Sequence, residues 1–63
     1  MKFKLVEWRR AKGITQDEMA KMLGISKPTY VRWERKPDNI TIGFANKIAK
    51  IFETDLSNII FLP

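Results

Sequence analysis

The stretch from residue 15 to residue 34 constrains the fold more than any other part of this chain. Thr15 and Glu18 have the spacing of a capping box, in which each side chain bonds the backbone N–H of the other residue at the start of a helix. Gly24 is suited to the positive φ that ends a helix, and Ser26 can cap the next one. The stretch therefore predicts two short helices joined by a tight turn.

Apolar residues in the same stretch predict how the two helices pack. Met19, Ala20 and Leu23 form one inward-facing stripe, and the small Ala20 stands where the helices would cross. Ile25 is the apolar residue that the turn carries inward. Two helices that cross around such a turn are typical of a helix-turn-helix, whose second helix enters the major groove of DNA.

The rest of the chain also has a helical pattern, and residues 1–63 predict a single all-α domain of five helices. No segment alternates with period two for long enough to predict a strand. Four helices are expected at about residues 4–12, 16–23, 27–35 and 42–52. A short fifth helix is expected after a cap at Asp55. Its inward-facing residues would be Leu56, Ile59 and Ile60.

Several other side chains are assigned to helix ends or to the core. Thr41 is the expected cap of the fourth helix, and Pro37 prevents the third helix from continuing. Trp8 and Trp33 are expected to pack in the core, while Tyr30 would point its ring inward and keep its hydroxyl near the surface. The predicted inward faces of the first and fourth helices are Leu5, Trp8 and Ala11, and Ile42, Ala45, Ile48, Ala49 and Phe52.

The composition excludes several kinds of site. The chain contains neither Cys nor His, so it has no thiolate or imidazole ligand for a metal ion. The remaining polar residues show no recognisable catalytic arrangement. We therefore expect no enzyme activity, no metal, no cofactor and no small-molecule ligand. No apolar run approaches the roughly 20 residues of a membrane helix, and no signal sequence is recognisable, so a cytoplasmic protein without membrane contact is expected.

The net charge of +5 is unevenly distributed along the chain. Residues 1–13 and 26–41 hold the basic surplus, and the second segment includes the helix that would enter the groove. A positive face at that place favours a polyanionic partner such as nucleic acid. An ordinary solvated surface is the alternative explanation of the charge alone.

One family pattern extends over nearly the whole chain, from about residue 4 to residue 60. It comprises Leu5, Trp8-Arg9, the run Ala11 to Gln16, Glu18-Met19-Ala20, the run Leu23 to Ser26, Trp33-Glu34-Arg35, Asn39, Thr41, the run Lys47 to Lys50, and Phe52. In these residues the chain resembles the phage repressor and Cro-type (Xre, lambda repressor-like) helix-turn-helix family. The resemblance implies a compact DNA-binding domain that needs no cofactor.

The resemblance implies that the start and middle of the third expected helix read DNA bases. The matching residues are Lys27, Pro28, Thr29 and Arg32. Lys27 and Arg32 carry donors suited to guanine O6 and N7, and Arg32 can make a bidentate pair. Pro28 departs from the polar residue that is common in the family, and it can offer a thymine methyl only an apolar contact. A solvated basic helix face is the alternative for Lys27 and Arg32.

The resemblance also implies contacts with DNA phosphates and one internal ion pair. Gln16 lies at the start of the second helix, where free N–H groups and the positive end of the helix dipole attract anions. The alternative is that Gln16 is simply a favourable first residue of the helix. Arg9 and Glu34 are implied to form a semi-buried salt bridge between the first helix and the end of the third. The other implied phosphate contacts are Ser26, Arg35, Lys36 and Asn39.

The function implied by the family is sequence-specific binding of double-stranded DNA by a transcriptional regulator. A repressor that reads a palindromic operator as a weak homodimer is expected, with Ile59, Phe61 and Leu62 at the dimer contact. The alternative for Phe61 and Leu62 is that they fold back over the first helix near Phe3. The alternative function is that of a protein-interaction module of the same fold, such as an antitoxin or a partner-binding subunit.

Overall fold

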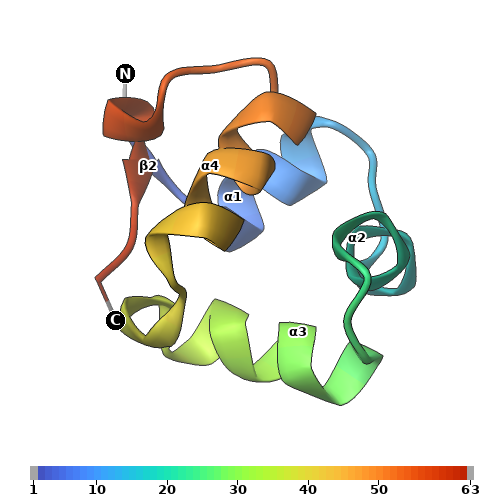
Figure 1. Ribbon diagram of the computed structural model, residues 1–63. Helices are drawn as coiled ribbons and strands as arrows, with labels where there is room; N and C mark the ends of the chain where they lie inside the picture. The colour runs from blue at the N-terminus through green and yellow to red at the C-terminus, as the bar shows by residue number, and fades with distance from the viewer. Residues whose placement is uncertain (1, 63) are drawn as a thin grey trace.

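Four α-helices pack around one core in the computed structural model, which describes residues 2–62 (Figure 1). The helix-turn-helix is made by α2 and α3, and α3 lies along the lower edge of the molecule in Figure 1. The elements in chain order are β1 (Phe3–Lys4), α1 (Leu5–Ala11), α2 (Gln16–Leu23), α3 (Lys27–Arg35), the 3-10 helix η1 (Pro37–Asn39), α4 (Ile42–Ile51), the 3-10 helix η2 (Leu56–Asn58) and β2 (Ile59–Ile60).

The predicted capping box at the start of α2 is confirmed. The hydroxyl of Thr15 accepts a hydrogen bond from the backbone N–H of Glu18 at 3.1 Å. The backbone N–H of Thr15 donates to the Glu18 carboxylate at 2.9 Å, and this bond holds the pKa of that carboxyl below its usual value. Both bonds of the capping box are therefore made, and they fix the first residue of α2.

The turn between α2 and α3 also follows the prediction. Gly24 has φ of +69° and its N–H bonds the carbonyl of Lys21 at 3.1 Å, which ends α2 in the left-handed conformation that favours Gly. Ser26 then starts α3, because its hydroxyl accepts from the backbone N–H of Thr29 at 3.4 Å. Pro28 fits the first turn of α3, where its missing N–H costs no hydrogen bond.

All four α-helices and β2 contribute residues to the core. Trp8 stacks on Phe52 with ring centroids 6.0 Å apart, and Trp33 meets Phe44 edge to face at 5.1 Å. Both tryptophans therefore pack against the core, as expected. The predicted stripe of α2 is buried in full. The buried apolar residues are Leu5, Met19, Ala20, Leu23, Tyr30, Ala45, Ile48, Ala49, Phe52 and Ile59.

The prediction of a fifth helix without any strand is wrong. Only one 3-10 turn forms after Asp55, closed by the N–H of Asn58 on the Asp55 carbonyl at 2.9 Å. The chain then extends, and Ile59 and Ile60 pair in parallel with Phe3 and Lys4. Two β-branched residues favour this extended conformation over another helical turn. A strand of two residues is too short to give the alternation on which a sequence prediction depends.

Some predicted side-chain positions are also wrong. Ile42 is 69 % exposed because it occupies the first position of α4, ahead of the helical turns that cover the core. Ala11 is exposed, and Arg9 instead shares the inward face of α1 with Leu5, four residues earlier.

The expected side-chain caps at Thr41 and Asp55 are absent from the part of the chain that the structure describes. Thr41 contributes to the start of α4 only through its carbonyl, which accepts from the N–H of Ala45 at 2.9 Å. Between residues 2 and 62, no helix is both long and apolar enough to cross a membrane.

Candidate nucleic-acid interface

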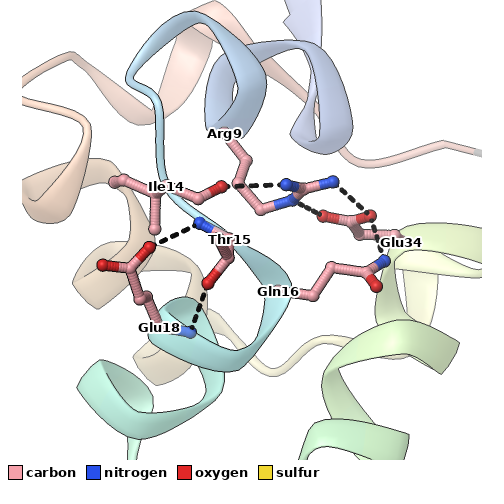
Figure 2. A network of polar contacts seen from close by, with 6 residues as sticks. All are labelled: Arg9, Ile14, Thr15, Gln16, Glu18 and Glu34. Carbon is pink, nitrogen blue, oxygen red and sulfur yellow. Dashed lines mark hydrogen bonds and ion pairs between the residues drawn. The ribbon is translucent and has the colours of Figure 1, made fainter.

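A buried ion pair joins α1 to the end of α3. Arg9 Nε donates to Glu34 Oε2 at 2.5 Å, and the two side chains are only 11 % and 8 % exposed. The second edge of the guanidinium is also occupied, because Arg9 Nη1 donates to the carbonyl of Ile14 at 2.8 Å. Arg9 thus connects three segments of the chain, including the loop that leads into α2 (Figure 2). The structure brings together the two residues that the resemblance paired.

Gln16 belongs to the same network, which the sequence did not indicate. Its side-chain Nε2 donates to Glu34 Oε1 at 3.0 Å (Figure 2). Burial alone would raise the pKa of Glu34, but the hydrogen bond from Arg9, with smaller effects of the neighbouring Tyr30 hydroxyl and of the Gln16 amide, outweighs burial and holds that pKa below its usual value. The hydrogen bond to Glu34 likewise raises the pKa of Arg9. Both partners therefore stay charged at neutral pH.

Tyr30 lies close to Arg9 and Glu34. The prediction that its hydroxyl is near the surface is wrong. The whole residue is buried, so the hydroxyl is not near the surface as expected. Within residues 2–62 the hydroxyl has no hydrogen-bond partner of good geometry. Burial raises the pKa of Tyr30, and the nearby Glu34 carboxylate raises it further. The phenol is therefore neutral and serves the packing of α3.

A shallow hollow opens at the start of α2, beside the start of α3. Its volume is about 450 Å³. The capping box uses the N–H groups of Thr15 and Glu18, which leaves those of Gln16 and Asp17 without an intrahelical partner. Free N–H groups at the positive end of a helix dipole suit an anion. The hollow is lined by Arg9, Arg10, Gly13, Ile14, Thr15, Gln16, Asp17 and Lys27.

The four residues implied to read bases lie along α3 with different exposures. Lys27, Pro28 and Arg32 are exposed, whereas Thr29 is half-buried. The Thr29 hydroxyl lies 2.8 Å from that of Ser26, so it takes part in the cap of α3. Pro28 and Arg32 are one helical turn apart and share a face of α3.

Lys27 has a partner that sequence reasoning missed. Its Nζ lies 3.7 Å from a carboxylate oxygen of Asp17, with the two side chains 52 % and 62 % exposed. The pair bridges the starts of α2 and α3, and both residues line the hollow. Nothing local in the sequence joins two residues in different helices, so no spacing rule predicts this contact.

The last residue of α3 and the turn that follows it present the remaining residues implied for phosphate contact. Arg35, Lys36 and Asn39 are all exposed. Pro37, between them, is buried and begins η1. The buried ring of Pro37 anchors this turn to the body of the domain, so Lys36 and Asn39 flank a fixed point next to Arg35 at the end of α3.

The residues implied for a dimer contact divide between core and surface. Ile59 is 6 % exposed and belongs to the core, and its backbone pairs with Phe3 between β2 and β1. Its side chain is therefore not available to a second copy. Phe61 is half-buried against the core, and Leu62 is 68 % exposed.

The capped α2, the left-handed turn at Gly24 and the exposed basic start of α3 define a helix-turn-helix domain. Comparison with known sequences gives the same class, since the profile of the helix-turn-helix family matches residues 5–59. The chain belongs to this family of DNA-binding domains, in its Xre/Cro type.

Two archaeal proteins are similar to this chain over most of their length. A protein of Archaeoglobus fulgidus, described as an uncharacterized HTH-type transcriptional regulator, is 32% identical over 59 residues, which cover 94% of this chain and 84% of the relative. A protein of Methanocaldococcus jannaschii with the same description is 36% identical over 59 residues, covering 94% of this chain and 89% of the relative. No solved structure matches the chain significantly.

Proposed function

We propose that this protein is a transcriptional regulator that binds double-stranded DNA in a sequence-specific manner, with α3 in the major groove. One observation carries the proposal: the exposed basic face of α3 begins beside the anion-suited hollow at the start of α2. A helix in the groove and a phosphate at the neighbouring helix start are compatible with one docking position. Both archaeal relatives carry the description of a transcriptional regulator, which supports the same function.

Base reading is assigned to the exposed side of α3. Arg32 donates two hydrogen bonds to guanine O6 and N7, and Lys27 donates to the same kind of acceptor from the helix start. Pro28 contributes an apolar contact that suits a thymine methyl. Thr29 lies next to Ser26, the cap of α3, and its methyl or hydroxyl group contacts a base edge that lies close to the helix start.

Contacts with the phosphate backbone position the domain and do not read sequence. Gln16 and Ser26 contact phosphates at the starts of α2 and α3. Arg35 at the end of α3, and Lys36 and Asn39 in the turn after it, contact phosphates at the other end of this helix. This arrangement needs no metal, cofactor or small-molecule ligand, and it leaves no role for enzymatic chemistry.

Repression from a palindromic operator is the most specific part of the proposal. Two copies related by a two-fold axis would place their α3 helices about one DNA turn, roughly 34 Å, apart. Leu62, with the outer edge of Phe61, provides the apolar contact between copies. A contact of this size is weak, so the dimer would form mainly on DNA by mass action.

Selection of binding sites from random duplex DNA tests the function. We expect a recovered motif with two inverted half-sites, and an affinity that falls steeply with salt, with a slope near −0.9 for each phosphate contact. Arg32→Ala should lower the ratio of specific to random binding, by about 1–3 kcal/mol of discrimination. Lys36→Ala is the matched control, because a lost phosphate contact weakens both kinds of DNA about equally. Absence of duplex binding at low salt would overturn the proposal in favour of a protein-interaction module.

A further inference from the structure

We propose that Glu34 and Arg9 position the side chain of Gln16 for its contact with a DNA phosphate. The pair would then act on DNA binding through Gln16, in addition to stabilising the fold. This inference rests on the proposed function, because it assigns positioning residues to one of the proposed phosphate contacts. It starts from the hydrogen bond between Gln16 Nε2 and Glu34 Oε1, at 3.0 Å.

The chemistry of the carboxamide makes this hydrogen bond directional. Gln16 has two N–H donors on Nε2 and one acceptor, Oε1, whereas the ionised Glu34 carboxylate only accepts. If the amide were turned over, Gln16 Oε1 would face a carboxylate oxygen and the two acceptors would repel each other. Glu34 therefore selects the orientation in which Nε2 points inward with one N–H. The second N–H on the same nitrogen remains for a phosphate oxygen.

Arg9 fixes the carboxylate that makes this selection. Arg9 Nε and Nη2 reach the two oxygens of Glu34 at 2.5 Å and 3.4 Å. The guanidinium is itself held by the carbonyl of Ile14 at 2.8 Å. Planar groups held on two edges have little freedom to rotate. The orientation of Gln16 is thus set from α1, through the end of α3; Figure 2 shows the hydrogen bonds that join Arg9, Glu34 and Gln16.

The location of Gln16 connects this network to the DNA-facing surface. Arg9, Ile14 and Gln16 all line the hollow at the start of α2, where free backbone N–H groups also lie. A side-chain donor held in place there loses less conformational entropy when it binds an anion. A freely rotating Gln16 would present its acceptor oxygen to the phosphate for part of the time.

A double-mutant cycle on DNA affinity separates positioning from simple stabilisation. The proteins are the parent, Gln16→Ala, Glu34→Gln and the double variant. Each is titrated with a selected operator and with a random duplex of the same length, where circular dichroism shows all four to be folded. Urea unfolding of the same proteins measures the structural effect separately.

We expect Glu34→Gln to weaken binding of both duplexes about threefold to tenfold in the parent, the range typical of one hydrogen bond. In the Gln16→Ala background the same change should cause no further loss of affinity, although it should lower stability in both backgrounds. Asp38→Asn, an exposed acid in η1, is the matched control for loss of one negative charge. Its effect on affinity should be the same with and without Gln16.

A second substitution covers the case in which Glu34→Gln fails to fold. Glu34→Asp keeps the charge opposite Arg9 but withdraws the carboxylate from Gln16, and it should show the same dependence on Gln16. Equal losses of affinity in the presence and absence of Gln16 would overturn the inference, and so would normal binding by Gln16→Ala, while the proposed function would stand. Failure of the parent to bind any duplex would instead overturn the proposed function itself.

Discussion

The indole N–H of Trp8 donates a hydrogen bond to the backbone carbonyl of Asn58 at 3.0 Å, and it joins residues that are 50 positions apart. The same indole stacks on Phe52 and receives the edge of Phe3 at 5.8 Å. Asn58 is held in turn, since its side-chain Nδ2 donates to the hydroxyl of Thr54 at 3.0 Å. Trp8 therefore binds both ends of the described chain to one side of the core.

The first prediction concerns this hydrogen bond. Trp8→Phe should lower the free energy of unfolding by about 1–3 kcal/mol, because the partly buried carbonyl of Asn58 loses its donor while an aromatic ring remains. Trp33→Phe is the matched control, since within residues 2–62 the Trp33 indole N–H makes no hydrogen bond. Urea unfolding measures both. Equal losses for the two variants would show that ring size alone decides the effect.

The second prediction concerns the end of α4, where Glu53 has φ of +55°. Its N–H and that of Thr54 close the helix on the carbonyls of Lys50 and Ala49, at 3.1 and 3.0 Å. This conformation costs an L-residue roughly 1–2 kcal/mol but suits Gly. Glu53→Gly should therefore raise the free energy of unfolding by about 0.5–1 kcal/mol, after the entropic cost of Gly.

Gly24→Ala is the reciprocal control for that prediction. Gly24 has φ of +69°, and a Cβ added there would meet no atom within 4 Å. The substitution should therefore lower stability by about 1 kcal/mol through backbone strain alone. Thermal or urea unfolding in which both variants moved in the same direction would contradict the assignment of strain.

The features that the sequence predicted are those made by neighbours in the chain. The capping box of Thr15 and Glu18 and the turn at Gly24 depend on residues within one helical turn, so spacing alone is sufficient. The same holds for the buried stripe of α2. The family resemblance added the pairing of Arg9 with Glu34, which spacing could not supply.

The features that the sequence missed join distant parts of the chain. The bond from Gln16 to Glu34 and the contact between Asp17 and Lys27 link separate helices, and neither has a local signal. The sequence did not predict the β1–β2 pairing for a different reason, because two residues are too few to show alternation. At the candidate site, the sequence thus indicated which residues take part, but not the hydrogen bond and the ion pair that orient their side chains.

The third prediction is a dependence of stability on pH. The folded-state pKa of Glu34 lies below its ordinary value of 4.5, so Glu34 binds its proton more weakly in the folded chain than in the unfolded one. Its contribution is therefore present in full above the ordinary pKa and is lost as the pH falls through the folded pKa. We expect the free energy of unfolding to decrease below about pH 5.

Comparison with Glu34→Gln assigns that pH dependence. The variant should be less stable at pH 7, since it leaves the buried Arg9 guanidinium without its counter-charge. Its stability should also decrease less steeply between pH 5 and pH 3 than that of the parent. Urea unfolding at constant ionic strength provides the measurement. A variant with the same acid slope as the parent would show that other carboxyl groups cause the loss.

The last prediction concerns Asp17, the negative side chain at the start of α2. Its carboxylate lies 3.7 Å from Lys27 Nζ, and it lines the hollow where we place a phosphate. An exposed pair of this kind adds little to stability, so Asp17→Asn should change the free energy of unfolding by less than about 0.5–1 kcal/mol. The same carboxylate repels a phosphate and competes with DNA for Lys27. Asp17→Asn should therefore raise affinity for duplex DNA about twofold to fivefold at low salt, and less at high salt.

Glu53→Gln is the control for Asp17→Asn, because Glu53 follows α4 and does not line the hollow. It removes the same charge and should leave affinity nearly unchanged. In a Lys27→Ala background, the gain from Asp17→Asn should shrink to the part that comes from direct repulsion of the phosphate. The Lys27→Ala background thus separates the two effects, and titrations at two salt concentrations test that both are electrostatic. If Asp17→Asn and Glu53→Gln raised affinity equally, net charge would explain the effect, and the contact between Asp17 and Lys27 would have no part in DNA binding.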